Sequence, residues 1–584
     1  MKEKFEVFIK KYGFSYLVVI IFLISNIYLN SLAPRIIGNT FDALEVDGFN
    51  KDTILYYLGM LILVSIIGFI TRFIWRYLIM GNSRKLECYL REELFKHLQT
   101  LPVEFYQERK TGDLLAYGIN DISAVRMTFG PGLANITNSI GMSIIVVLSM
   151  SQAIHPKLTL YSLVPVPVII YLMIKIGSLI RRRFTIVQEN FAAISDRVQE
   201  NISGIRVIKA YVQEKEEVEK FQILNDNMRE SNIKMVRASS LLTPMMELCF
   251  GFSFMISLLY GSSLVKSNII SLGDFIAFNG YLTMIIRPIR SIGRVINISQ
   301  RGMASYKRLD NIFKVKSDIV HNTGDPNLID IHGDIEFRDL TFKYKNAEEP
   351  VLKNINLKIE RGKTLGIIGD TGSGKTTLVD ILLRLYNVDE GMVFIDGRDI
   401  NDYSLSVLRE NIGYVPQDNF LFSASIKDSI NFSRDIYSDE EIEEATKLSL
   451  IYDNIVNFTH GFDTIVGERG VNLSGGQKQR LSIARAIIKQ PNILIFDDAL
   501  SAVDTKTEDK ILDHFKEIMN GNTGIIIAHR ISSIKDADEI AVMNHGQIIE
   551  KGNHEELLER RGHYFKIFKD QYKEEAEKVE NEKS

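Results

Sequence analysis

The chain has 584 residues, which is too many for one hydrophobic core, so more than one domain is expected. Its formal net charge is −4, and without a dominant basic patch this balance argues against a nucleic-acid-binding protein. The two cysteines, Cys88 and Cys249, do not stand at the spacing of a metal site.

The first half of the chain alternates long apolar segments with charged ones. Residues 1–15 are rich in lysine and are expected to form a cytoplasmic segment that leads into the first membrane helix. A membrane-spanning helix needs about 20 mostly apolar residues. This requirement predicts a membrane domain over residues 16–309. Its six expected spans are residues 16–32, 54–78, 133–152, 158–176, 244–265 and 275–296.

Basic residues gather in the two long segments that separate the second span from the third and the fourth from the fifth. This asymmetry predicts that both segments lie in the cytoplasm. Both also show helical periodicity, so we expect membrane helices that continue into the cytoplasm. Turns are expected at residues 106–117 and 210–221, where they could contact a cytoplasmic domain. Solvated linker helices are the alternative interpretation.

Ionisable side chains also fall inside the predicted spans. Arg72 and Arg76 lie in the second, Glu247 in the fifth, and Arg287 and Arg290 in the sixth. Because a charge is costly in lipid, such groups usually face a wet cavity or one another. Structural pairing, or snorkelling towards the membrane interface, explains them most simply. The alternative is a polar cavity in which Glu247 attracts cationic substrates.

The composition changes at residues 310–331, which form a polar linker. Residues 332–571 then alternate short β-branched runs with helical patterns, as in an α/β domain. Residues 572–584 are charged and predict a disordered tail. The expected fold class is an α-helical membrane domain fused to an α/β domain.

The strongest motif of the second half is GDTGSGKTT, between a strand-like run and a helical one. It fits the phosphate-binding loop pattern G-x-x-x-x-G-K-[ST]. Its glycines let backbone N–H groups surround phosphate oxygens, and the following helix adds a favourable dipole. Lys375 is expected to reach the outer phosphates. The expected nucleotide-binding residues of this loop are Gly369, Asp370, Thr371, Gly372, Ser373, Gly374, Lys375, Thr376 and Thr377.

A second motif is the apolar run of residues 493–496, which ends in Asp497 and Asp498. A strand with this ending places a carboxylate beside the phosphate loop. Asp497 and the Thr376 hydroxyl are expected to coordinate Mg²⁺, and Asp498 lies where a base could orient the attacking water. The sequence therefore predicts ATP and Mg²⁺ as ligands.

The segment LSGGQ, residues 473–477, resembles the signature sequence of ATP-binding cassette proteins. The resemblance covers nearly the whole chain, with a membrane domain followed by one cassette, as in exporter half-transporters of the multidrug and lipid-flippase type. It implies a dimer in which each ATP lies between one phosphate loop and the partner's signature. The signature residues implied to contact nucleotide are Ser474, Gly475, Gly476 and Gln477.

Further residues stand in the order of that family. Tyr344 resembles the aromatic residue that stacks on adenine, and Gln417 resembles the glutamine that links Mg²⁺ to the membrane domain. His529 resembles the histidine that contacts the γ-phosphate. The resemblance thus implies Lys375, Gln417, Asp498 and His529 as the catalytic set. Residues 111–114, 208–211, 467–470 and 501–504 resemble other contact segments of the family.

One position departs from the family pattern. Most members have glutamate where this chain has Asp498. The shorter side chain would withdraw the carboxylate by about 1 Å, and a misplacement of that order can cost roughly 100-fold in rate. This pattern resembles heterodimeric multidrug exporters, in which one subunit has an impaired site and its partner supplies the glutamate. Impaired subunits often lack the histidine as well, whereas His529 is present here.

The function expected from the sequence is ATP-driven export of hydrophobic or amphipathic compounds, as in multidrug efflux, by one subunit of a heterodimer. The expected partners are a second half-transporter with an intact glutamate, the lipid bilayer and a hydrophobic small molecule. The expected location is a bacterial cytoplasmic membrane, with the cassette on the cytoplasmic side. A lipid or peptide exporter is one alternative. A regulatory subunit that binds ATP but hydrolyses little of it is another.

Overall fold

The computed structural model describes residues 1–47, 50–317, 319, 330–432, 436–467, 473–501, 503 and 505–573. The chain forms two units. The first holds residues 1–100 and 109–316, and the second holds residues 101–108 and 317–584. A short segment of the N-terminal half therefore belongs to the C-terminal unit.

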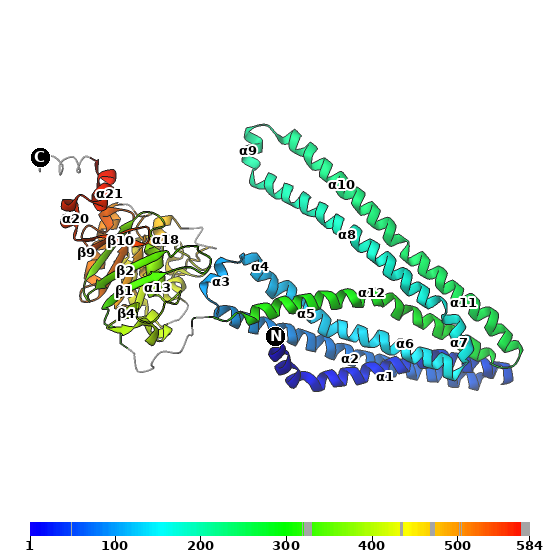
Figure 1. Ribbon diagram of the computed structural model, residues 1–584. Coiled ribbons are helices and arrows are strands. Elements are labelled where there is room, and N and C mark those ends of the chain that lie inside the picture. Colours follow the sequence, from blue (N-terminus) through cyan, green and yellow to red (C-terminus); the bar gives the residue numbers. More distant parts are fainter. Residues whose placement is uncertain are drawn as a thin grey trace. The chain divides into compact units, whose positions relative to one another are not determined.

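The first unit is entirely helical where it is described (Figure 1). Its most extensive helix contacts join α1 with α2, α8 with α10, and α12 with both α1 and α6. The elements are α1 (Lys2–Asp47), α2 (Lys51–Gln99), α4 (Thr111–Ala116), η1 (Tyr117–Asp121), α5 (Ile122–Met127), η2 (Thr128–Gly132), α6 (Leu133–Ala153), α7 (Pro156–Leu163), α8 (Pro165–Ser203), α9 (Ile205–Ala210), α10 (Glu214–Ser240), α11 (Leu242–Lys266) and α12 (Leu272–Lys314).

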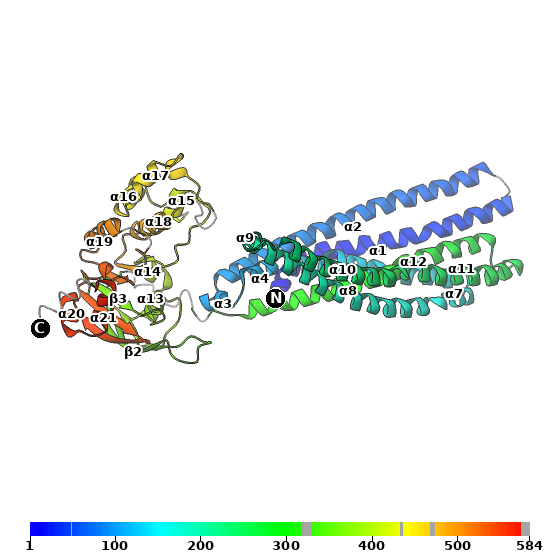
Figure 2. The same ribbon diagram turned by 90° about the horizontal axis from the view of Figure 1, so that it is seen from above.

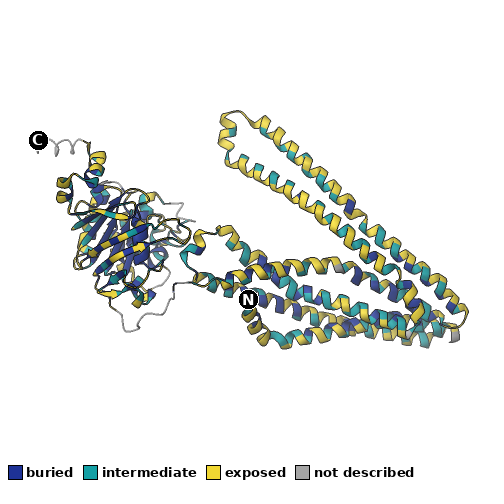
Figure 3. Ribbon diagram, viewed as in Figure 1, coloured by how far each residue is buried: buried dark blue, intermediate teal, exposed yellow. Residues whose placement is uncertain are grey.

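Within the described residues, five helical segments are long and apolar enough to cross a membrane. They are Lys2–Glu45, Lys51–Gln99, Thr111–Gln152, Pro156–Ser203 and Glu214–Lys266, and each contains one of the first five predicted spans. Their outer faces expose large apolar side chains, including Phe69 and Leu259. Figure 3 shows exposed positions along the helices of this unit. Lipid rather than water suits such faces. The sixth span, residues 275–296, lies in α12, contains the charged Arg287 and Arg290, and stays a prediction.

The long helices exceed the thickness of a bilayer. At about 1.5 Å per residue, the 49 residues of α2 are far longer than a hydrocarbon core of about 30 Å requires. The helices α8 and α10 lie side by side and are joined at one end by α9 (Figure 1). This joint occupies residues 204–213, so the turn predicted at residues 210–221 is placed too late. Residues 214–221 belong to α10, whose acidic first turn is a helix-start signal.

The first predicted turn, at residues 106–117, contains the gap between α3 (Val103–Gln107) and α4. The Nε2 of Gln107 donates to the Tyr386 hydroxyl at 2.9 Å, and the Nδ2 of Asn346 donates to Oε1 of Glu108 at 2.7 Å. Phe105 is buried in the same segment. The start of this turn, Gln107 and Glu108, therefore contacts the second unit.

The helices α1 and α12 cross closely at two glycines. A Cβ atom added to Gly38 would lie 2.4 Å from the carbonyl oxygen of Gly273. We expect Gly38→Ala to lower the unfolding temperature of the detergent-solubilised protein, because overpacking of this kind costs about 1–3 kcal/mol. Gly59→Ala is the matched control, since a Cβ there meets nothing within 4 Å. Equal unfolding temperatures for the two variants would contradict the close crossing.

The second unit contains two sheets. The six-stranded sheet has the order β10-β9-β3-β8-β7-β6, and in it only β10 is antiparallel to its neighbour. The four-stranded sheet has the order β2-β1-β4-β5, and all of its pairs are antiparallel. The strands are β1 (Ile335–Phe342), β2 (Leu352–Ile359), β3 (Thr364–Gly369), β4 (Val393–Ile395), β5 (Arg398–Asp399), β6 (Ile412–Val415), β7 (Ile493–Asp497), β8 (Thr523–Ile527), β9 (Glu539–Asn544) and β10 (Gln547–Gly552).

Helices flank the larger sheet, and β7 and β8 are buried along their whole length. Figure 2 shows α15 to α18 gathered in one helical group of this unit. The remaining helices of the unit are α13 (Lys375–Leu382), α14 (Leu405–Glu410), α15 (Ile426–Asn431), α16 (Asp439–Leu448), α17 (Tyr452–Val456), α18 (Gly475–Ile487), α19 (Thr505–Ile518), α20 (His554–Arg560) and α21 (His563–Gln571). Ligands of parallel α/β sheets bind at the carboxyl ends of the strands, and that is where the predicted motifs lie.

Candidate nucleotide site

The phosphate loop joins the end of β3 to the start of α13. Two of its glycines are required by the backbone. A Cβ atom at Gly369 would lie 2.0 Å from the carbonyl oxygen of Met543. Gly374 has a φ of +99°, in the left-handed region, and its Cβ would lie 2.7 Å from the side chain of Leu352. The sequence therefore folds here into a loop whose backbone can approach a ligand closely.

Lys375 is the first residue of α13, and its side chain is buried. Its Nζ donates to the carbonyl oxygens of Gly369 at 2.8 Å and Asp370 at 2.9 Å. Burial lowers the pKa of Lys375, although nearby aspartates act in the opposite direction. An ammonium group with so little hydration gains more from a phosphate than an exposed lysine does.

Ser373 provides a test of whether the loop suits an anion. Its Oγ is buried and has no hydrogen-bond partner within the described part of the chain. Buried hydroxyls are normally paired. A phosphate oxygen in the loop would supply the missing partner, so the loop fits a nucleotide.

Thr376 and Asp497 lie together at the carboxyl end of the sheet. The Thr376 hydroxyl donates to Oδ1 of Asp497 at 3.3 Å, and the Tyr414 hydroxyl donates to Oδ2 at 3.3 Å. Burial raises the pKa of Asp497. A hydroxyl and a single carboxylate are hard oxygen donors that suit Mg²⁺, an ion that takes the rest of its shell from phosphates and water. The donor set therefore fits Mg²⁺.

The side chains of Gln417 and Asp498 are neighbours in the site. The Nε2 of Gln417 donates to Oδ2 of Asp498 at 3.4 Å. Asp498 follows the last residue of β7, its φ is +48°, and its backbone N–H donates to the carbonyl oxygen of Ile527 at 2.9 Å. Aspartate is among the residues that tolerate this conformation best. The carboxylate thus stands at the tip of a buried strand, as the sequence predicts.

One cavity of about 400 Å³ unites these side chains. The Tyr344 hydroxyl is 2.9 Å from Oγ1 of Thr377, and this contact holds the ring at the edge of the cavity. The residues that line it are Tyr344, Val351, Thr371, Gly372, Ser373, Gly374, Lys375, Thr376, Thr377, Gln417, Asp497, Asp498, Ile527 and His529. The structure therefore brings the predicted metal-binding and catalytic residues together with phosphate-loop residues 371–377, whereas Gly369 and Asp370 do not line the cavity.

The signature residues do not line this cavity. Ser474 caps α18, its Oγ accepting from the Gln477 backbone N–H at 3.3 Å. Oε1 of Gln477 accepts from the Ser474 N–H at 2.9 Å, which completes a capping box. Ser474 and Gly475 are exposed. The predicted contacts at residues 468–470, 502 and 504 lie outside the described residues.

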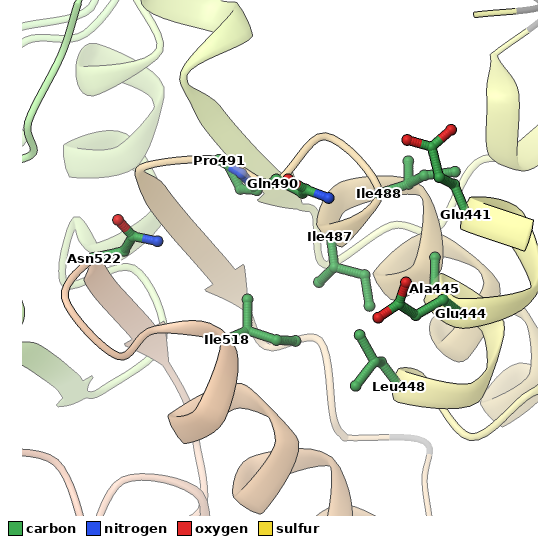
Figure 4. Close-up of a pocket in the computed structure, with 10 residues that line it drawn as sticks. All are labelled: Glu441, Glu444, Ala445, Leu448, Ile487, Ile488, Gln490, Pro491, Ile518 and Asn522. Carbon is green, nitrogen blue, oxygen red and sulfur yellow. The ribbon is translucent and has the colours of Figure 1, made fainter. Parts of the chain in front are cut away.

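Another hollow, of about 280 Å³, lies between α16, the end of α18 and the end of α19 (Figure 4). Glu441 and Glu444 point from one side, and Asn522 lies on the other. Each residue that lines it lies outside the predicted site. It is separate from the candidate nucleotide site.

Some residues of the site escaped the sequence analysis. Val351 and Ile527 line the cavity through the fold alone, and Tyr414 reaches Asp497 because β6 pairs with β7. His563 lies 3.7 Å from Asp370 of the phosphate loop. For Tyr414, the sequence offered one signal: it stands in a strand-like run three residues before Gln417.

A helical unit with membrane-spanning segments, on the same chain as a nucleotide site of this geometry, defines a membrane transporter driven by ATP. The comparisons agree. Residues 16–289 match the family described as "ABC transporter transmembrane region", and residues 352–501 match that described as "ABC transporter". The chain therefore belongs to the ABC exporters whose membrane domain is fused to the cassette.

Several relatives share nearly its full length. The chain is 38% identical over 562 residues to "Probable multidrug resistance ABC transporter ATP-binding/permease protein YheI" of Bacillus subtilis (strain 168), covering 96% of each chain. It is 34% identical to "Multidrug resistance-like ATP-binding protein MdlA" of Escherichia coli (strain K12), covering 96% of this chain and 95% of the relative. It is also 34% identical to "ATP-dependent lipid A-core flippase" of Syntrophus aciditrophicus (strain SB), covering 84% of this chain and 81% of the relative.

A solved structure shares the fold as well. It is described as "Structure of a bacterial Atm1-family ABC exporter with ATP bound", with a TM-score of 0.79 and 25% identity, covering 96% of this chain and 99% of that one. This protein is accordingly a multi-pass membrane protein of the cell membrane and an ATPase coupled to transport.

Proposed function

We propose that this chain is one subunit of a heterodimeric bacterial exporter that expels hydrophobic or amphipathic compounds, drugs among them, across the cytoplasmic membrane. The observation that carries the heterodimer is Asp498, a shortened base in an otherwise complete nucleotide site. Relatives named for multidrug resistance support the substrate class. The relative named as a lipid A-core flippase keeps a lipid as the second candidate.

In the proposed mechanism, the backbone of the phosphate loop and Lys375 hold the phosphates of ATP. Thr376 and Asp497 would hold Mg²⁺, with Gln417 beside them, and the bound ion would offset the charge on the phosphates. Asp498 orients the attacking water, and His529 contacts the γ-phosphate. Tyr344 is proposed to stack on the adenine. The cassette lies in the cytoplasm, and residues 310–331 connect it to the membrane domain.

The exposed signature supports a dimer. The N-terminus of α18, a helix of 13 residues, presents a positive dipole end that attracts phosphate. Ser474 and Gly475 are exposed there and lie outside their own chain's cavity. We propose that Ser474, Gly475, Gly476 and Gln477 complete the nucleotide site of the partner subunit.

The membrane helices support a dimer too. Glu247 is exposed on α11, and Arg287 and Arg290 are exposed on α12. Ionised groups on lipid-facing surfaces are costly. A polar cavity shared with a second subunit would shelter them, and Glu247 would then favour cationic substrates.

The exposed end of the α8 and α10 pair also carries apolar side chains that a partner subunit could bury. Tyr211 and Val212 are 73% and 79% exposed, and Val207 of α9 is 61% exposed. Apolar side chains at the tip of a cytoplasmic turn are poorly suited to water. We propose that this tip docks on the partner's cassette and transmits its movement.

ATP-dependent uptake into inside-out vesicles tests the function. Vesicles that contain this chain and a glutamate-bearing partner should accumulate a hydrophobic cationic dye, and Lys375→Ala should reduce this uptake. Transfer of a fluorescent phospholipid without dye uptake would favour the lipid exporter. Nucleotide binding without transport of either probe would favour the regulatory subunit, the alternative that Asp498 also supports.

A further inference from the structure

Gln571, the last residue of α21, contacts the segment that carries His529. Its side-chain Nε2 donates to the carbonyl oxygen of His529 at 2.7 Å. Its Oε1 accepts from the backbone N–H of Ile531 at 3.0 Å. Neither contact follows from the nucleotide-binding motifs, because Gln571 lies outside all of them.

The two contacts require the chemistry of an amide. One partner is a carbonyl, which needs a donor, and the other is an N–H, which needs an acceptor. Glutamate at this position would lack the donor, and lysine or arginine would lack the acceptor. The paired bonds also determine the orientation of the amide, since exchanging O and N would leave both contacts repulsive. Gln571 thus holds residues 529–531 at two points.

The helix that presents Gln571 is firmly anchored. The backbone N–H groups of His563 and Tyr564, at the first turn of α21, donate to the carboxylate of Glu550 in β10. Tyr564 and Phe568 are buried against the core. A Cβ atom at Gly562 would collide with the Glu550 side chain, so the glycine keeps this approach open. A well-packed helix can hold a side chain more accurately than a loop can.

The other side of the same segment is held by α19. Glu508 is 1% exposed, and its Oε1 accepts from the Ser533 hydroxyl. Its Oε2 lies 3.7 Å from the guanidinium of Arg530. The segment that carries His529 is therefore fixed between α19 and α21, and His529 itself lines the nucleotide cavity.

We propose that Gln571 is a positioning residue for ATP hydrolysis: its amide fixes the backbone of residues 529–531 and so sets the place of the His529 side chain. The proposal rests on the proposed role of His529 at the γ-phosphate. A shift of about 1 Å at a reacting group can cost roughly 100-fold in rate. Loss of the amide should therefore reduce turnover while leaving the phosphate loop, and ATP binding by it, in place.

Gln571→Met in the purified transporter, with its partner subunit where one copurifies, tests this. Methionine keeps the length of the side chain and removes both hydrogen bonds. Lys566→Met is the matched control, because Lys566 is exposed on the same helix. We expect Gln571→Met to lower kcat for ATP hydrolysis at least about 10-fold with KM within about twofold of the wild type. A wild-type kcat would overturn the proposal.

A double variant separates positioning from general damage. In a His529→Ala background, Gln571→Met should cause little further loss, because the group that it positions is already absent. If the fold losses in kcat caused by His529→Ala and by Gln571→Met multiply in the double variant, the two residues act independently and the proposal is overturned. If His529→Ala alone leaves hydrolysis unchanged, the proposed role of His529 fails instead, so the two failures can be told apart.

Hydrogen–deuterium exchange provides a readout that needs no activity. Gln571→Met should speed exchange of the Ile531 amide, because its acceptor is gone, and Lys566→Met should not. Gln571→Glu, which keeps the acceptor but not the donor, should preserve that protection and still lower kcat. Unchanged exchange in Gln571→Met would overturn the proposal.

Discussion

Lys375→Ala is expected to lower ATP hydrolysis at this chain's own site by roughly 100- to 1,000-fold, as removal of a preorganised donor does in other enzymes. The Lys375 ammonium is buried and partly desolvated between two loop carbonyls. Because its charge is so little hydrated, the phosphates of ATP would be its strongest partner. The variant should also bind a fluorescent ATP analogue more weakly.

The measurement is the steady-state ATPase rate of the purified protein, with Lys506→Ala as the control. Lys506 is exposed on α19, so its loss removes the same charge without touching the site. The unfolding temperatures of both variants are measured alongside, so that a loss of turnover can be distinguished from a loss of stability. Turnover within about twofold of the wild type would mean that this chain's site contributes little hydrolysis, which supports the regulatory alternative.

The nucleotide site could be predicted because its parts are local. The phosphate loop is a continuous strand, loop and helix, so its geometry follows from nine neighbouring residues. Asp497 and His529 stand at or just beyond the ends of β7 and β8, and parallel strands bring such ends together. The phosphate loop and Asp497 therefore followed from local motifs, whereas Tyr344, Gln417 and His529 were placed by the resemblance to the family.

Contacts that depend on tertiary packing could not be predicted in the same way. Tyr414 reaches Asp497 across paired strands, and Gln571 reaches His529 across the domain. Neither partner is visible in a linear pattern. The tip of the α8 and α10 pair was placed too late because its charged residues were assigned to the turn, whereas Glu214, Glu216 and Glu217 form the first turn of α10.

The second large effect is expected from Asp498→Glu, which should raise ATP hydrolysis by this chain at least severalfold and by up to about 100-fold. The Asp498 carboxylate is held 3.4 Å from Nε2 of Gln417, on a strand tip anchored by the bond to Ile527. One more methylene would bring the carboxylate nearer to the water that it orients. The positive φ at this residue is less favourable for glutamate than for aspartate, so part of the gain is offset.

Asp498→Asn is the matched control, because it keeps the length and removes the charge, and we expect it to lower the residual rate. The rates are measured on the chain purified alone and again with its partner. Weak wild-type turnover that rises with Asp498→Glu would identify an impaired site, and the competent glutamate must then come from another chain. Strong wild-type turnover that Asp498→Glu leaves unchanged or lowers would make Asp498 a competent base. Two identical sites would then suffice, and a homodimer would explain the exposed signature and the exposed charges of α11 and α12 equally well.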